Sequence, residues 1–243
     1  MSKVEEYRRT LQSLEDWVPF LMKNSGLPGP RGNLELAYAV AKEGDSKRFN
    51  HLLTFHAHEN TPDVFVVFCG VVGLGKLAAH QPDLFNRLRE YASDPRWRIR
   101  EAVATGLQLA GDQEIDLLLK EMKTWSQGDW YEKRAAAATL AEPRLLKNPK
   151  HAKQVLQVLV KITKSMETNK NSRDDAFQVL RKAMGYCWSV AVVALPDFGK
   201  PLMERWLNSP DKDIRWVMRE NLNKNRLAKM DAAWVESSLK RLA

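Results

Sequence analysis

The residues of this chain whose types and spacing could bind a ligand are arginines and lysines interleaved with aromatic residues. The segment SDPRWRIREAVATGL at 93–107 places three arginines beside a tryptophan, at the start of an apolar helical pattern. Cationic side chains bind phosphate groups, and neighbouring aromatic rings can contact sugars or bases. This combination predicts a surface that binds nucleic acid.

The positive charge of the chain is unevenly distributed. The net charge is +8, but residues 1–60 carry eight Lys/Arg and eight Asp/Glu, so the whole surplus lies in residues 61–243. A basic surplus confined to one region is typical of proteins that bind a polyanion. The alternative is that the surplus serves solubility alone.

The residue patterns of several enzyme and metal-binding classes are missing from the sequence. It has no zinc-type cysteine cluster, no H-E-x-x-H, no Walker motif and no nucleophile elbow. Gly70, Gly73 and Gly75 have no strand before them and no G-K-[ST] after them, so they predict close helix packing. His56 and His58 are two residues apart, which points them to different helix faces. We expect no metal site and no cofactor.

The two cysteines and the short apolar runs bear on the cellular compartment of the protein. Cys69 and Cys187 cannot form a disulfide framework, and we expect buried thiols in a reducing environment. The charged start MSKVEEYRRT has no apolar core after it, which predicts no signal peptide. The longest apolar run, 64–74, is far shorter than the ~20 residues of a membrane span. These features predict a cytoplasmic protein without a membrane partner.

Helical periodicity runs through nearly the whole sequence. The segments 113–124 and 154–162 place apolar residues three and four positions apart, and no stretch shows sustained strand alternation. Breakers such as SDP, SQGD, LPDFG and NSPD separate segments of about 10–18 residues. The pattern predicts an all-α fold.

A repeated unit appears when three segments are aligned. Each has a turn with Asp, Pro or Gly, then an arginine (Arg100, Arg134 or Arg215), then small or apolar residues. The first two arginines are 34 positions apart and the last two are 81 apart, which leaves room for one more unit. That unit is S172-R-D-D-A-F-Q-V-L-R, where Gln178 falls near the arginine position. An amphipathic helix precedes each unit.

This repeat resembles HEAT repeats. The pairs Ile99–Arg100 and Ile214–Arg215 match the apolar-Arg pair of that family, and Lys133–Arg134 keeps only the arginine. The resemblance implies a right-handed α-solenoid of armadillo-like helix pairs over residues 61–243, in which each pair contacts its neighbours.

Residues 1–60 do not fit the repeat, and we expect them to form an N-terminal helical cap. Its predicted helices are 4–22, 34–41 and 46–56, with a loop at 24–33. The segment 61–80 is apolar on every side and predicts a buried helix.

The resemblance also implies that the second helix of each pair lines a concave face. The predicted second helices are 96–110, 130–141, 176–192 and 213–227, with a summed charge of +7, against +3 for the first helices at 82–92, 113–124, 151–164 and 198–208. We therefore expect the following residues to bind nucleic acid: Arg96, Arg98, Arg100, Trp130, Lys133, Arg134, Arg181, Lys182, Trp188, Arg215, Trp216, Arg219 and Lys224. Alternatively, Arg100, Arg134 and Arg215 bond Asp residues between repeats, and part of the aromatic set is core.

A narrower resemblance is to the alkylpurine DNA glycosylases with HEAT-like folds. The segment W130-Y-E-K-R134-A-A-A is close to a Trp-x-x-Arg-Ala-Ala segment of that family, with a spacing one residue longer. In that family an Asp near paired tryptophans stabilises positive charge that develops on the sugar. This sequence has no Trp-Trp-Asp run. The nearest candidate is Asp129, beside Trp130 and Tyr131, and its alternative role is an N-cap.

The leading hypothesis from the sequence is a non-catalytic HEAT-like protein that binds nucleic acid, with duplex DNA favoured. One alternative is a relative of the glycosylases that acts in DNA repair. Another is a scaffold that binds a protein partner, as many HEAT arrays do. We expect a monomer in each case.

Overall fold

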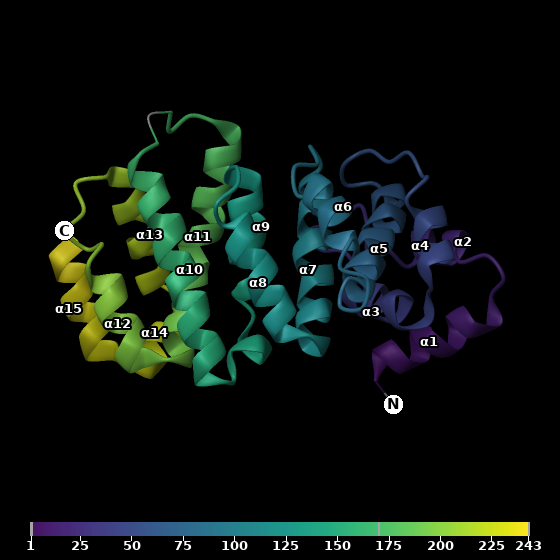
Figure 1. The fold of residues 1–243 in the computed structure, drawn as a ribbon. Helices are drawn as coiled ribbons and strands as arrows, with labels where there is room; N and C mark the ends of the chain where they lie inside the picture. Colours follow the sequence, from purple (N-terminus) through teal and green to yellow (C-terminus); the bar gives the residue numbers. More distant parts are fainter. Residues whose placement is uncertain (1, 170, 243) are drawn as a thin grey trace. The chain divides into compact units, whose positions relative to one another are not determined.

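The computed structural model describes residues 2–169 and 171–242, and those residues contain helices and no β-strand (Figure 1). Helices account for 74% of the chain. The prediction of an all-α fold is confirmed. The chain divides into two compact units, residues 1–114 and 115–243. The predicted boundary at residue 60 lies inside the first unit.

Seven helices form the N-terminal unit: α1 (Lys3–Ser13), α2 (Val18–Lys23), α3 (Leu34–Glu43), α4 (Ser46–Leu52), α5 (Pro62–Leu77), α6 (Leu84–Tyr91) and α7 (Trp97–Gln113). The expectation of one helix over 4–22 is wrong. Helix α1 ends where Leu14 adopts an extended backbone, and α2 starts anew with Pro19 in its first turn. A proline fits there because the first N–H groups of a helix have no intrahelical acceptor.

Helix α5 is the centre of the N-terminal unit. It packs against α2, α3, α4, α6 and α7, and every residue from Val64 to Gly75 is buried. Each apolar side of this helix therefore packs against a neighbouring helix. The prediction of a buried helix is confirmed.

The glycines of α5 allow neighbouring elements to approach closely. A Cβ atom on Gly73 would lie 2.3 Å from the ring of Phe49 on α4. A Cβ atom on Gly75 would lie 2.3–2.4 Å from backbone atoms of Gly106 on α7. The prediction that these glycines serve helix packing is confirmed.

The C-terminal unit contains α8 (Ile115–Trp125), α9 (Trp130–Leu140), the 3₁₀ helix η1 (Pro143–Leu146), α10 (Pro149–Glu167), α11 (Asp175–Ala194), α12 (Pro196–Glu204), α13 (Lys212–Leu222), α14 (Asn225–Met230) and α15 (Ala232–Leu242). The expected single helix at 213–227 is two helices. Helix α13 ends before Asn223, and the extended backbone of Lys224 begins α14.

Helix α11 is the centre of the C-terminal unit. It packs against α9, α10, α12, α13 and α14. Trp188 is fully buried on α11 and donates from Nε1 to Thr163 Oγ1 on α10 at 3.0 Å. The amide of Asn221 on α13 accepts from Ser189 N and donates to Met184 O, both on α11. These polar contacts set the register between α11 and its two neighbours.

Helices of like position in successive pairs lie against one another in the C-terminal unit. Helix α9 packs against α11 and α11 against α13, while α8 packs against α10 and α10 against α12 (Figure 1). As a result, the turns that precede α11 and α13 come to one end of adjacent helices.

Replacement of Gly75 by alanine tests the close packing of α5 on α7. We expect Gly75→Ala to lower the free energy of unfolding by about 2 kcal/mol, because the methyl group would overlap the Gly106 backbone and overpacking costs about 1–3 kcal/mol. Urea unfolding followed by circular dichroism measures the change. Gly32→Ala is the control, since its Cβ would make an ordinary 3.4 Å contact with Phe65. Equal stability of the two variants would contradict the assignment.

Candidate nucleic-acid interface

The repeated polar residue near the start of each second helix bonds back to its own turn. Arg100 Nη1 donates to the carbonyls of Asp94 and Pro95 at 2.5 and 2.8 Å. Arg215 Nη1 donates to the carbonyls of Ser209 and Pro210 at 2.9 and 3.2 Å. In both cases the acceptors lie six and five residues before the arginine, so the two turns have the same construction.

In the repeat segment that begins at Ser172, a glutamine makes the same contact. Gln178 Nε2 donates to the Ser172 carbonyl, again six residues back, at 2.5 Å. On α9, Lys133, which is next to the repeat residue Arg134, donates from Nζ to the carbonyl of Gly128, five residues back. Burial lowers the pKa of Lys133, and the charges of Asp129 and Glu132 oppose that shift. Lys133 is therefore a turn-stabilising residue as well as a cation.

The predicted binding residues of the N-terminal unit are engaged within that unit. The guanidinium of Arg96 pairs with Asp94 at 2.7 Å, which raises the pKa of Arg96. The side chain of Arg98 is 4% exposed. Its Nη2 donates to the Gly29 carbonyl at 2.6 Å and to Asn60 Oδ1 at 2.8 Å. Arg98 therefore ties the loop at 24–33 to α7, which is a structural task.

A cleft in the C-terminal unit brings three of the predicted cations together, Arg181, Arg215 and Arg219. Its volume is about 590 Å³, and its lining residues are Ser172, Arg173, Gln178, Arg181, Lys212, Asp213, Arg215, Trp216, Arg219 and Leu242. Five of these side chains are cationic and one is a carboxylate. They come from α11, the turn before it, α13 and the end of α15. An anion would enter this cleft with favourable electrostatic energy.

Arg181 and Trp216 form the floor of the cleft. The guanidinium carbon of Arg181 lies 3.7 Å from the centroid of the Trp216 ring, and its Nε lies 2.7 Å from Asp213 Oδ1. Gly185 on α11 allows this approach, because a Cβ there would already lie 3.3 Å from the Trp216 ring. Arg219 donates to the Leu242 carbonyl at 2.8 Å. These contacts hold the guanidinium groups of Arg181 and Arg219 in place before any ligand arrives.

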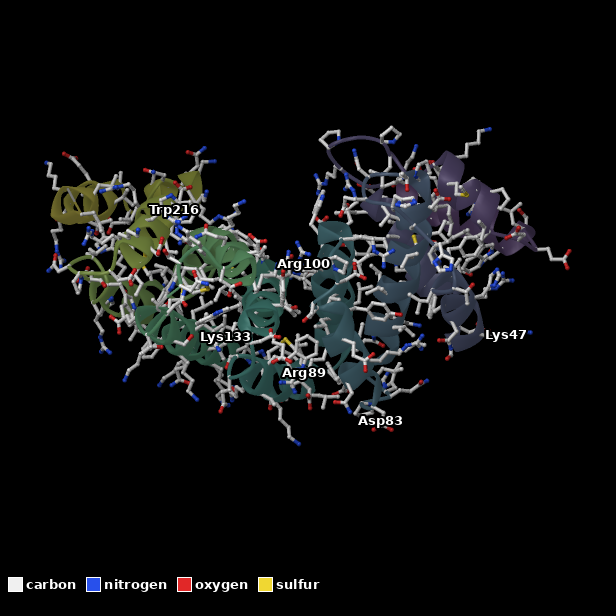
Figure 2. All side chains as sticks on the ribbon, turned by 90° about the horizontal axis from the view of Figure 1, so that it is seen from above. Lys47, Asp83, Arg89, Arg100, Lys133 and Trp216 are labelled. Atoms are coloured by element: carbon white, nitrogen blue, oxygen red, sulfur yellow. The ribbon has the colours of Figure 1, made fainter. Side chains whose placement is uncertain are left out.

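Four of the predicted residues meet in this cleft: Arg181, Arg215, Trp216 and Arg219. Figure 2 marks Trp216 on α13, and it marks Lys133 on α9 of the same unit. The ring of Trp130 packs edge-on against the ring of Phe177, with 5.4 Å between the ring centroids. Lys224 Nζ lies 3.7 Å from Glu220 Oε2. Lys182 is exposed on α11, and Arg134 is half-buried on α9. Trp188 belongs to the core, so its expected place on the binding surface is wrong.

Sequence reasoning missed Arg173 and Lys212 as cleft residues. Arg173 lies in the turn before α11, in the segment S172-R-D-D, and Lys212 is the first residue of α13, in the segment S209-P-D-K-D. The repeat alignment contained the signal for them, because equivalent turns of adjacent units come to the same end of the unit. The prediction considered only the helices and so omitted these two cations.

Asp129, the weak catalytic candidate, is the N-cap of α9. Its side chain accepts from Glu132 N at 2.8 Å, and the Glu132 carboxylate accepts from Asp129 N at 3.1 Å. This reciprocal arrangement is a capping box. The Asp129 carboxylate therefore has a structural task at the first turn of α9.

Three further properties of the described residues bear on function. Within residues 2–169 and 171–242, no three His, Cys, Asp or Glu side chains gather in a way that could hold a metal ion. No helix in these same ranges has the length and apolar composition needed to cross a membrane. Burial raises the pKa of the Cys187 thiol to about 12, so this cysteine stays protonated at neutral pH.

Comparisons with known proteins leave the family of this chain open. No family model matches the sequence, and no curated protein matches it. The crystal structure of an engineered protein aligns over 98% of this chain and 98% of its own, with 16% identity and a TM-score of 0.37. A likeness at that level supports no conclusion about this chain.

Removal of the Arg98 guanidinium tests its structural role. We expect Arg98→Ala to lower the free energy of unfolding by about 1–3 kcal/mol, because the Gly29 carbonyl and the Asn60 amide oxygen lose a buried donor. Chemical unfolding measures the change, with Lys182→Ala on the exposed side of α11 as the control. A stable Arg98→Ala protein would show that this residue has no structural role.

Proposed function

We propose that the C-terminal unit binds nucleic acid through phosphate groups in the cleft between α11 and α13, without catalysis. The observation that carries this proposal is the charge of the cleft, where five cationic side chains surround one carboxylate. A nucleic-acid backbone presents phosphates in a regular row, and cations on adjacent helices can contact successive phosphates. Its polyanionic charge also complements the basic surplus of residues 61–243.

We favour duplex DNA over a single strand as the ligand. Proteins that bind single strands stack successive bases on free aromatic faces. In this cleft one face of the Trp216 ring is covered by the Arg181 guanidinium at 3.7 Å. Trp216 then serves to hold Arg181 in place, and the contacts go to the phosphate backbone.

We also propose that the C-terminal unit is a HEAT-like stack of helix pairs, and that the cleft is part of this stack. Its first helices would be α8, α10 and α12, and its second helices α9, α11 and α13. Support comes from the packing of α9 on α11 and α11 on α13, and from the recurring bond of Arg215 and Gln178 to their own turns. A stack of this kind repeats the same turn and helix start at regular intervals, so residues such as Arg173, just before α11, and Lys212, at the start of α13, form a row.

Removal of two cleft cations tests the proposal. We expect Arg173→Ala/Lys212→Ala to weaken binding to a short labelled duplex and to make the dependence of log K on log salt shallower by about 2. The reason is that each lost phosphate contact releases about one counterion fewer. Fluorescence anisotropy at salt concentrations of about 50–200 mM measures both quantities.

The matched control for this experiment is Arg205→Ala/Lys229→Ala. It removes the same charge from two exposed positions of the same unit that do not line the cleft. We expect its salt dependence to equal that of the unmodified protein. Equal loss in both double variants would mean that binding follows net charge and not the cleft. No binding at about 50 mM salt would reject the proposed function.

A further inference from the structure

A second concave surface of the C-terminal unit lies on helices α8, α10 and α12. Figure 1 shows α10 flanked by α8 and α12, and both of those helices pack against it. A groove of about 500 Å³ follows these three helices. Its lining residues are Lys123, Gln154, Gln157, Val158, Val160, Lys161, Phe198 and Leu202. The groove shares no residue with the basic cleft.

The floor of the groove is apolar. Val158 and Val160 come from α10, and Phe198 and Leu202 come from α12, where their spacing of four residues places them on one helix face. Val160, Phe198 and Leu202 are half-buried, so each keeps part of its apolar surface in contact with water. Removal of this surface from water would stabilise a bound apolar side chain.

The rim of the groove is cationic. Lys123 lines it from α8 and Lys161 from α10. Lys153 Nζ lies 5.2 Å from the centroid of the Phe198 ring. The exposed residues Lys150, Lys153, Gln157, Lys161 and Lys164 follow one another at three- and four-residue spacing, so a basic stripe runs along α10. Among residues 2–169 and 171–242, no carboxylate lines the groove.

We propose that this groove docks an acidic amphipathic helical segment of a protein partner. Apolar side chains of that segment contact Phe198, Leu202 and Val160, and its carboxylates lie against Lys153 and Lys161. An apolar stripe with acidic flanks complements an apolar floor with a basic rim, in the manner of other helix-in-groove interactions. A nucleic-acid backbone would satisfy the lysines but would leave the apolar floor unused.

Selection from a random-peptide phage library against the folded protein tests this proposal. We expect the selected peptides to carry net negative charge and two or more large apolar residues at helical spacing. Synthetic copies should bind the unmodified protein by anisotropy. Lys153→Glu/Lys161→Glu should weaken their binding by about tenfold or more, because the rim would then repel carboxylates.

Two further variants make the result specific. Phe198→Ala should also weaken peptide binding, since it removes part of the apolar floor. Lys229→Glu/Lys240→Glu carries the same charge change at exposed positions outside the groove and should leave peptide binding unchanged. Circular dichroism of each variant checks that the unit is folded.

Several outcomes would overturn the docking proposal. They are a selection that yields no acidic amphipathic peptide, equal peptide binding by the groove and control variants, and a loss of duplex binding in Lys153→Glu/Lys161→Glu. Binding of anionic lipid vesicles through the same lysines, without peptide binding, would also overturn it. Because the cleft and the groove share no residue, the two proposals can be tested independently, and failure of one does not contradict the other.

Discussion

The bond from a polar side chain near the start of a second helix to the carbonyls of its own turn is the interaction on which the cleft depends. Arg215 and Gln178 each bond a carbonyl six residues back. The turn before a helix has backbone acceptors that no helical N–H can satisfy. The same geometry recurs before α11 and α13, and Arg173, just before α11, and Lys212, at the start of α13, line one cleft.

This interaction divides the cations of the chain into two groups. Arg98 and Lys133 are held by carbonyls of their own unit, and their burial gives each of them a structural task. Arg173, Lys212 and Arg219 are exposed and line the cleft. A count of charge per helix gives both groups equal weight. The charge that can act on a ligand is therefore more concentrated on α11 and α13 than the net charge of the helices indicates.

The all-helical character of the chain could be predicted from sequence because it depends on local patterns. The equivalence of Gln178 to the repeat arginines followed from spacing alone, and its bond to Ser172 agrees with it. The tasks of Arg98 and Trp188 could not be predicted in this way. Arg98 bonds Gly29, which is 69 positions away, and Trp188 bonds Thr163 on another helix. Helical periodicity identifies an apolar face but does not say which tryptophan on it is covered.

The two proposed sites lie on different surfaces of the C-terminal unit and share no residue. The second helices α11 and α13 carry the basic cleft, while the first helix α10 carries the groove with α8 and α12. Trp188 and Thr163 join α11 to α10 inside the core, so the surface of either helix can vary in sequence while that internal contact is kept. A nucleic acid in the cleft and a peptide in the groove would contact different residues. If both sites function, they can be occupied at the same time, and this unit would link a nucleic acid to a protein partner.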